Sequence, residues 1–225
     1  MQHLIRNLLG FALATLLASA DAAVAATTMP TEVPSASGVP ALEPPRHSIN
    51  GVLSSRWHQK LADVEKQVPK TWRLIEKAKD KLVFEGQQFG SNRCKAVLSF
   101  RESDELFRLI LIVPIEGEQQ VSERFVQVID ELNQRLKEPY NWQYYEENEL
   151  LDERDSESEY TAERISRVNA GDGRFASYWM VGNSLVLLDT SKANTEIEVP
   201  YLWLMAEYTG FQPPYETEVI EDLLR

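Results

Sequence analysis

The sequence predicts an α+β fold: an antiparallel sheet with amphipathic helices packed on one face. Two observations predict it. In the first half of the chain, two stretches with apolar residues at helical spacing flank a pair of short apolar segments joined by a polar turn. The last third carries several short apolar and aromatic segments separated by turn-forming residues. A doubly wound parallel sheet would need helices and strands to alternate, so this order argues against it.

The first 25 residues are typical of a secretory signal peptide. Arg6 supplies a positive charge, residues 8–20 are apolar or small, and small-residue cleavage patterns end at Ala22 and Ala25. An uncleaved anchor is disfavoured because the stretch is shorter than the roughly 20 residues that span a bilayer. We expect cleavage after Ala25 or Ala26 and export. The single cysteine and the absence of Asn-x-Ser/Thr sequons favour the bacterial periplasm.

Residues 26–50 predict a flexible linker that is rich in proline. Five prolines stand among Ser, Thr, Ala and Gly, a composition that buries too little apolar surface to offset the entropy of ordering. The remaining residues, 51–225, are expected to form a single α+β domain with an acidic loop at 146–159.

The order of helices and strands follows from the apolar spacing. Helical spacing or capping signals predict helices at 57–82 (kinked at Pro69), 118–137, 200–210 and 216–224. Alternation or short apolar runs predict strands at 95–101, 106–113, 140–144, 161–168, 174–181 and 185–190. Turns are predicted at 102–105, 169–173 and 182–183, the last of these a hairpin.

Charge is distributed unevenly along the chain. The net charge of −12 argues against binding to nucleic acid, because phosphate affinity depends on Lys and Arg. Residues 138–225 contain 19 acidic and 6 basic residues, together with all eight tyrosines and three of the five tryptophans. Within them, 146–159 holds eight acids and only Arg154 as a basic residue. One interpretation is a solvated, mobile acidic loop. The other is a docking surface for a basic protein, in which charge speeds the encounter and aromatic side chains supply contact area.

We therefore predict an exported protein-binding domain, an inhibitor or immunity-type protein that masks a cationic toxic or lytic enzyme. The expected partner-binding residues are acidic or aromatic members of one region: Tyr140, Trp142, Tyr144, Tyr145, Glu146, Glu147, Glu149, Asp152, Glu153 and Asp155. No catalytic residue, metal ligand or cofactor is predicted.

Two other classes remain open: a carboxylate-dependent hydrolase of the cell envelope, and an envelope scaffold that stacks glycans on its aromatic residues. The sequence has no G-x-S-x-G, no phosphate-binding glycine loop and no H-E-x-x-H. A nucleophilic pair of Cys94 with His47 or His58 is disfavoured, because His47 falls in the expected linker and His58 follows Trp57. Cys94 is expected to be a buried residue at the start of a strand.

Overall fold

The computed structural model describes residues 45–138, 141–146 and 161–224, all within one unit, Glu43–Arg225. The predicted signal peptide, the linker up to residue 44 and the acidic residues 147–159 lie outside the described residues. The secondary structure of the described part comprises three helices and twelve strands. The helices are α2 (Leu61–Gln67), α3 (Val121–Leu136) and α4 (Ala162–Ala170). The long strands are β4 (Arg73–Lys77), β5 (Lys81–Gln88), β6 (Ser91–Phe100), β7 (Leu106–Pro114), β8 (Asn141–Glu146), β9 (Gly173–Val181), β10 (Ser184–Ser191) and β11 (Tyr201–Tyr208). The short strands are β1 (His47–Ile49), β2 (Gly51–Val52), β3 (Ser55–Arg56) and β12 (Glu218–Ile220).

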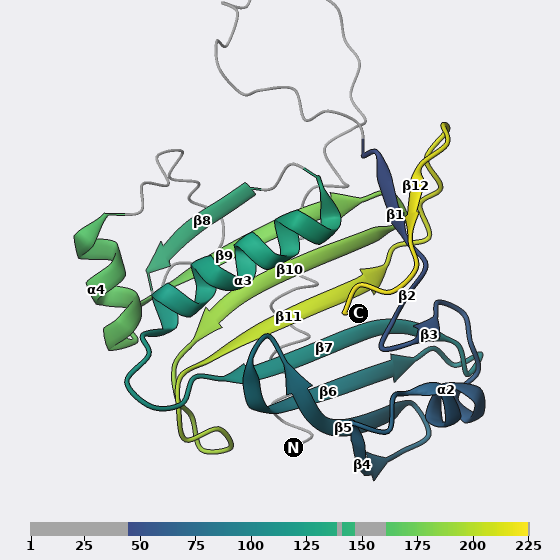
Figure 1. Ribbon diagram of the computed structural model, residues 1–225, viewed down its shortest axis with the longest axis horizontal. Helices are drawn as coiled ribbons and strands as arrows, with labels where there is room; N and C mark the ends of the chain where they lie inside the picture. The colour runs from purple at the N-terminus through teal and green to yellow at the C-terminus, as the bar shows by residue number, and fades with distance from the viewer. Residues whose placement is uncertain (1–44, 139–140, 147–160, 225) are drawn as a thin grey trace, which may run out of the picture. The chain divides into compact units, whose positions relative to one another are not determined.

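One eight-stranded sheet organises the unit, with the strand order β4-β5-β6-β7-β11-β10-β9-β8 (Figure 1). Each neighbouring pair in it is antiparallel, so the predicted α+β class with an antiparallel sheet is confirmed. The sheet consists of two meanders, β4 to β7 and β8 to β11. They join where β7 pairs with β11, for example at Leu109 with Ala206 and at Leu111 with Leu204.

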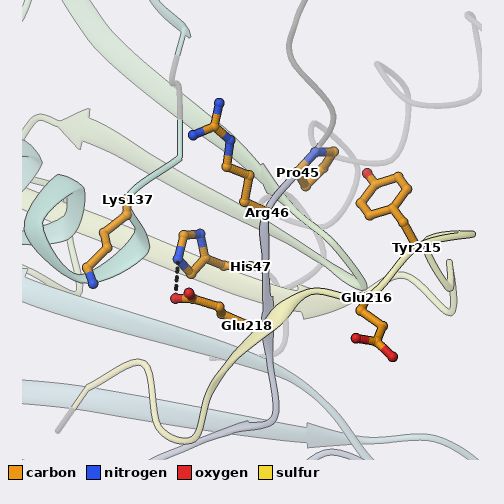
Figure 2. A pocket seen from close by; sticks show the side chains of 7 residues that line it. All are labelled: Pro45, Arg46, His47, Lys137, Tyr215, Glu216 and Glu218. Atoms are coloured by element: carbon orange, nitrogen blue, oxygen red, sulfur yellow. Dashed lines mark ion pairs between the residues drawn. The ribbon is translucent and has the colours of Figure 1, made fainter.

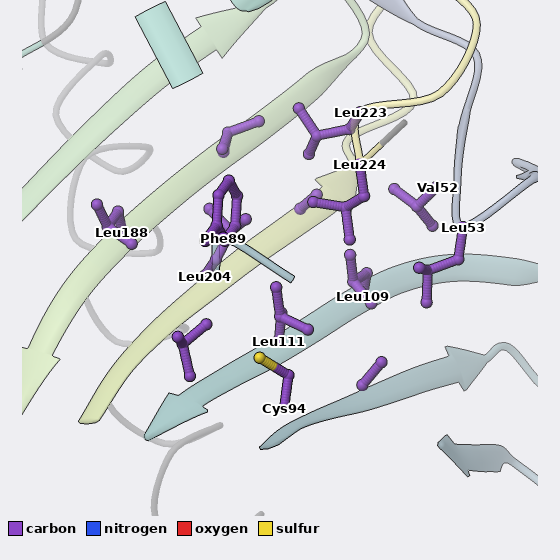
Figure 3. Close-up of a cluster of buried hydrophobic side chains, with 14 of the residues drawn as sticks. Val52, Leu53, Phe89, Cys94, Leu109, Leu111, Leu188, Leu204, Leu223 and Leu224 are labelled. Atoms are coloured by element: carbon purple, nitrogen blue, oxygen red, sulfur yellow. The ribbon is translucent and has the colours of Figure 1, made fainter. Parts of the chain in front are cut away.

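The main core lies on the side of the sheet that α3 crosses (Figure 1). Alternate residues of each strand point to this side. Phe125 of α3 stacks on Phe175 of β9 with ring centroids 5.7 Å apart, and both side chains are buried. The indole Nε1 of Trp179 donates to Oδ1 of Asn133 at 2.8 Å, which satisfies its buried polar atom. Figure 3 shows Cys94 in this core beside Leu111.

The other side of the sheet carries a second apolar cluster. Val83, Val97, Ile110, Met205 and Leu187 are direct cross-strand partners on five successive strands, so they form one continuous row. Ile197, from the segment before β11, also belongs to this cluster. The central strands are therefore apolar on both faces, which removes the alternation that usually identifies a strand.

Several predicted elements are confirmed with small changes of boundary. The helix at 118–137 is α3, and the segments at 95–101, 106–113, 174–181 and 185–190 correspond to β6, β7, β9 and β10. The hairpin turn at 182–183 joins β9 to β10. The segment at 140–144 overlaps β8, although Tyr140 lies outside the described residues.

The prediction of a kinked helix over 57–82 is wrong. Only α2 is helical, and Val68 already has the extended angles φ −52° and ψ 132° before Pro69. Trp72 donates its backbone N–H to the carbonyl of Pro69 at 2.8 Å, which turns the chain into the β4–β5 pair. Proline stops the helix here because it lacks a backbone donor, and residues 73–88 gain their hydrogen bonds from sheet pairing instead.

The prediction of a strand over 161–168 is also wrong, because these residues begin α4. The side chain of Thr161 accepts a hydrogen bond from the backbone N–H of Arg164 at 3.3 Å, as an N-cap does. Gly171 ends the helix with φ +83°, a conformation that glycine adopts without a steric penalty.

The two helices predicted near the C-terminus are strands. Residues 201–208 form β11, which pairs with β7 and β10 in the centre of the sheet. Within 216–224, residues 218–220 form β12, which pairs in parallel with β1. β1 itself lies inside the range predicted as a linker, and His47 and Ile49 are buried, so ordered structure begins earlier than the sequence suggests. No helix in the part of the chain described here is long and apolar enough to cross a membrane.

Candidate functional site

The predicted partner-binding residues are only partly visible. Tyr140, Glu147, Glu149, Asp152, Glu153 and Asp155 lie outside the described residues. Trp142 and Glu146 lie in β8, and the backbone of β8 pairs with that of β9. Tyr144 and Tyr145 are the two whose side chains can be placed.

Tyr144 and Tyr145 have different surroundings. The Tyr144 ring packs edge-on against Phe175, with centroids 5.9 Å apart, and the guanidinium of Arg164 lies 5.1 Å from its centroid. Tyr144 is therefore attached to the main core. The guanidinium of Arg174 lies 5.1 Å from the Tyr145 ring, and the Tyr145 hydroxyl donates to Oε1 of Gln143. Neighbouring residues of a strand face opposite sides, so these two tyrosines do not share one contact surface.

A pocket that the sequence did not predict lies where β1 meets β12. Its volume is about 660 Å³, and its lining comes from three parts of the chain: Pro45, Arg46, His47, Lys137, Tyr215, Glu216 and Glu218 (Figure 2). The register of the parallel pair sets His47 directly against Glu218. Lys137 is the residue at which α3 ends. The pocket is therefore lined by this helix end and by residues near both ends of the described chain.

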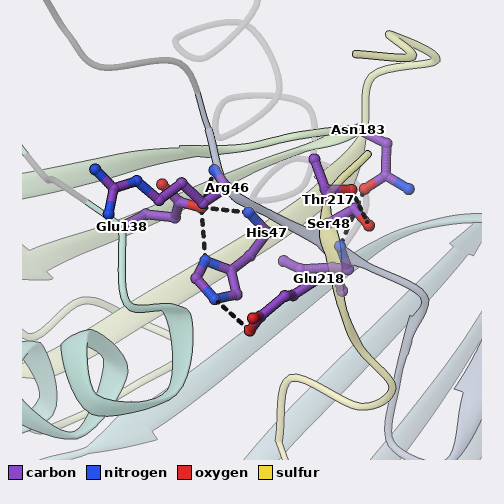
Figure 4. Close-up of polar contacts among 8 residues, drawn as sticks. Arg46, His47, Ser48, Glu138, Asn183, Thr217 and Glu218 are labelled. Atoms are coloured by element: carbon purple, nitrogen blue, oxygen red, sulfur yellow. Dashed lines mark hydrogen bonds and ion pairs between the residues drawn. The ribbon is translucent and has the colours of Figure 1, made fainter. Parts of the chain in front are cut away.

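His47 is held from within by Glu138. The carboxylate Oε1 of Glu138 accepts hydrogen bonds from Nδ1 of His47 at 2.8 Å and from the backbone N–H groups of Arg46 and His47 at 2.6 and 2.5 Å (Figure 4). The Glu138 side chain is only 1% exposed. Because a carboxylate oxygen only accepts, Nδ1 carries the hydrogen and the orientation of the ring is fixed. Three donors stabilise the charge that burial would otherwise disfavour.

The second nitrogen of His47 faces the pocket. Nε2 lies 3.2 Å from Oε2 of Glu218, whose side chain is 80% exposed. When the imidazole is protonated, Nε2 donates to Glu218 and the two form an ion pair. When it is neutral, its lone pair opposes the carboxylate and can accept a proton from a molecule in the pocket. The neutral imidazole can thus act as a base toward a molecule in the pocket.

The strand that carries His47 is fixed on both sides. Ile220 accepts the backbone N–H of Asn50 at 2.8 Å, and Thr217 donates its hydroxyl to Ser48 Oγ at 3.0 Å. On the other side, Asn183 Oδ1 accepts the backbone N–H of Ile49 at 3.1 Å. Gly182 allows this approach, because a Cβ there would lie 2.6 Å from the His47 carbonyl oxygen.

Beside the pocket, apolar side chains are exposed to solvent. Six large hydrophobic residues are exposed in the described chain: Ile75, Val126, Met180, Phe211, Tyr215 and Val219. The last three fall within nine residues of one another and are 52%, 39% and 55% exposed. Exposed carboxylates at 216 and 218 stand between them. We call Phe211, Tyr215, Glu216, Glu218 and Val219 the C-terminal patch, a set of exposed residues defined by their nearness in the sequence; Glu218 and Val219 are neighbours in β12 and face opposite sides of that strand. It combines acidic and apolar side chains, as expected for 140–155, but in another segment.

On sequence, His47 was considered only as a partner of Cys94 and was disfavoured because it falls in the expected linker, and nothing local identifies it as part of this site. It stands after Pro44 and Pro45, and its partners Glu138 and Glu218 are far away in the sequence. The one local signal is the alternation of His47, Ile49 and Gly51 with polar residues, which is typical of a short strand.

Within the described ranges, no group of three or more His, Cys, Asp or Glu side chains is arranged to hold a metal ion. Comparisons with models of known protein families, with curated proteins and with solved structures found no match. The site is therefore defined by its own geometry: an imidazole oriented by a buried carboxylate, beside an exposed acidic and apolar patch.

Proposed function

We propose that this protein is a binding domain of the cell envelope that docks a cationic protein, as an inhibitor or immunity-type protein does. We further propose that the C-terminal patch is part of the contact. The observation that carries the proposal is that Phe211, Tyr215 and Val219 are all exposed and lie within nine residues of one another in the sequence, next to the exposed Glu216 and Glu218.

The physical reason is that exposed apolar side chains are unfavourable in water. When a partner covers them, their removal from water favours binding. Clustered aromatic side chains contribute most of the binding energy in many interfaces. The surrounding negative charge would speed the encounter with a basic partner. The acidic residues at 146–159 add to the same long-range field, since residues 138–225 carry 19 acids against 6 basic residues.

The periplasm is the proposed location. Support for it comes from the sequence: the apolar stretch at 8–20 with small-residue cleavage patterns. Mass spectrometry of the protein isolated from the envelope fraction should find Ala26 or Thr27 as the first residue. Envelope material that begins at residue 1 would contradict cleavage.

The binding proposal can be tested with matched triple variants. The first replaces Phe211, Tyr215 and Val219 by Ser, and the control replaces the other exposed hydrophobics, Ile75, Val126 and Met180, by Ser. Each is immobilised and exposed to envelope extract at low and high salt, and captured proteins are identified by mass spectrometry.

We expect the wild type and the control to capture the same basic protein, more of it at low salt, and the patch variant to lose it. If both triple variants capture equal amounts of this protein, the C-terminal patch is not part of the contact. No salt-sensitive basic protein in any sample would overturn the binding function.

A hydrolase is the second candidate, favoured by one observation. Glu138 fixes the His47 ring with Nε2 toward the pocket, the geometry by which a carboxylate orients a catalytic imidazole. If the pocket is catalytic, the wild type should release soluble fragments from purified cell-wall glycan, His47→Gln should abolish the release, and the control variant with Ile75, Val126 and Met180 replaced should retain it. No release by the wild type would exclude this activity on wall glycan.

A further inference from the structure

Glu218 and His47 link the two strands of the small sheet that β1 and β12 form. The register sets the two residues opposite each other, and Nε2 of His47 lies 3.2 Å from Oε2 of Glu218 (Figure 4). We propose that the charge of His47 controls how firmly β12 is held on β1: firmly in mild acid, when the imidazole is protonated, and more loosely at neutral pH. The proposal goes beyond the docking function and needs no partner, because it concerns contacts within the chain.

The His47 ring cannot turn away from Glu218 without the loss of another contact. Its Nδ1 donates to Oε1 of Glu138 at 2.8 Å, and that carboxylate is almost completely buried. A rotated ring would leave a buried acceptor without one of its donors, which is unfavourable. Nε2 is therefore directed at Glu218 whether or not it carries a proton.

The proton on Nε2 decides whether this contact attracts or repels. Without the proton, the lone pair of Nε2 faces a carboxylate oxygen, and neither atom can donate a hydrogen bond. With it, the N–H donates to Glu218 and the two side chains carry opposite charges. Because the Glu218 side chain is 80% exposed, it can move into water when the ring is neutral. Histidine side chains generally change charge between about pH 5 and 8, so the contact responds within this range.

Other charged groups of the described chain also face the ring. Glu138, which follows α3, binds Nδ1. Arg46, Lys137 and Glu216 line the pocket that Nε2 faces. The two carboxylates attract a positive imidazole and the two cationic side chains repel it, so their effects partly cancel. Glu218 is the group that lies against Nε2, so its contact changes most with the charge of the ring.

β12 is a short strand, so a single side-chain contact can affect how firmly it is held. It has three residues. The backbone N–H of Glu218 donates to the carbonyl of Arg46 at 2.8 Å, and the carbonyl of Ile220 accepts the N–H of Asn50 at 2.8 Å. A pair of strands is marginally stable by itself.

β1 is anchored more firmly than β12. His47 and Ile49 of β1 are 7% and 0% exposed, whereas Val219 in the middle of β12 is 55% exposed. Segments with few buried side chains open locally before the rest of a fold does. β12 also carries Glu218 and Val219 of the C-terminal patch, so the charge of His47 determines how firmly this part of the patch is held.

The experiment is hydrogen exchange of the full chain, followed by mass spectrometry, at about pH 5.5 and about pH 7.5. The measured quantity is the protection factor of fragments that contain the backbone amide of Glu218, because this factor corrects for the chemical effect of pH on exchange. Fragments from β6 report any effect of pH or substitution on the whole fold.

Two variants test the two members of the contact, and a third is the control. Glu218→Gln removes the charge but keeps the size of the side chain. His47→Asn keeps an amide donor for Glu138 in place of Nδ1 and removes Nε2. Glu216→Gln makes the same change as the first variant at a neighbouring acid of the same segment.

We expect the wild type to protect the Glu218 amide about two- to threefold more at the lower pH, as an exposed ion pair allows. Glu216→Gln should keep this difference, whereas Glu218→Gln and His47→Asn should abolish it. No difference in the wild type, or the wild-type difference in Glu218→Gln, would overturn the proposal. If β6 shows that His47→Asn is unfolded, Glu218→Gln decides, because its side chain is exposed. The docking function is tested separately, since this experiment contains no partner.

Discussion

The imidazole Nδ1 of His47 lies 2.8 Å from Oε1 of Glu138, although the two residues are separated by 91 positions in the chain. Glu138 follows Lys137, whose left-handed conformation, with φ +51°, ends α3. This turn directs the carboxylate at the backbone of β1. A single buried side chain therefore attaches the first described strand to the helix that covers the sheet.

Replacement of Glu138 by Ala should destabilise the fold. The backbone N–H groups of Arg46 and His47 and the imidazole would all lose their acceptor in a buried site. We expect a loss of roughly 2–4 kcal/mol in the free energy of unfolding. Urea denaturation measures it, with Glu218→Ala as the control, because that exposed side chain should change stability by less than about 0.5 kcal/mol. Equal stability of the two variants would mean that Glu138 does not hold β1.

Asp189 predicts a dependence of stability on pH. Burial raises the pKa of this carboxyl from 3.8 to about 7, against the opposing effect of Arg174, whose Nη1 lies 3.2 Å from Oδ2. Between pH 4 and 7 the folded protein therefore keeps a proton that the unfolded chain has released. Since the folded state binds more protons, its stability falls as pH rises through this range and is constant above it.

The variant Asp189→Asn removes this titration. The free energy of unfolding of the variant minus that of the wild type should increase from pH 4 to pH 8, by at most about 4 kcal/mol. Taking the difference cancels the titration of all other groups. A difference that is flat with pH would show that Asp189 is ionised in the folded protein throughout.

How far the sequence could predict this fold depended on whether each signal was local. α3 was predicted because its apolar stripe from Val121 to Leu136 lies against the sheet while its other face is polar. α4 was missed although its N-cap Thr161 was available as a local signal. β11 was read as a helix because Pro200 and Gly210 suit the start and the end of a short helix. Because the strand is buried on both faces, no alternation of polar and apolar residues identified it as a strand.

The candidate site was beyond local signals. β1 and β12 are three residues each, and they are strands only because they pair with each other across the whole chain. The charge asymmetry could be read from composition. Whether Phe211, Tyr215 and Val219 are exposed depends on which other residues of the folded chain pack against them. A sequence alone does not give that information.

Cys94 should react slowly with thiol reagents in the native protein. Its side chain is 0% exposed, and burial raises the pKa of its thiol from 9.0, which lowers the thiolate fraction. Labelling with a maleimide, followed by mass spectrometry, should be at least about tenfold faster in denaturant, because reaction requires the core to open. Cys94→Ser is the control for labelling elsewhere. Rapid native labelling would show that β6 opens readily.

Gly86 should not tolerate a side chain. A Cβ at this position would lie 2.4 Å from Cδ2 of the Trp72 ring, which is itself buried. Either the ring or strand β5 must move, so Gly86→Ala should lower the free energy of unfolding by about 1–3 kcal/mol. The double variant Gly86→Ala, Trp72→Leu tests the cause, since the smaller side chain removes the clash. If the added methyl group costs as much in the Trp72→Leu background, the contact is not the reason.

We expect slower association with the basic protein identified by the capture experiment when five acidic residues are replaced by Gln or Asn. These residues are Glu146, Glu147, Glu149, Asp152 and Glu153. The effect should be largest at low ionic strength, because salt screens the attraction between separated charges. Stopped-flow association measures it, and a variant with five exposed acids of residues 26–137 neutralised is the control. If the association rates equal those of the wild type at every salt concentration, these residues do not contribute to partner binding.

The pairing of β7 with β11 also determines the order in which the sheet can be completed. β7 ends at Pro114 and β11 begins at Tyr201. A chain that emerges with its N-terminus first therefore exposes the whole first meander long before β11, the strand that pairs with the edge of β7, is available. At about 5–20 residues per second, that interval is several seconds. During this time the edge of β7, with Leu109 and Ile110 on its two faces, offers unpaired hydrogen-bonding groups between apolar side chains. The emerging chain is therefore most prone to aggregate at this stage, and a chaperone that binds extended apolar segments would act here.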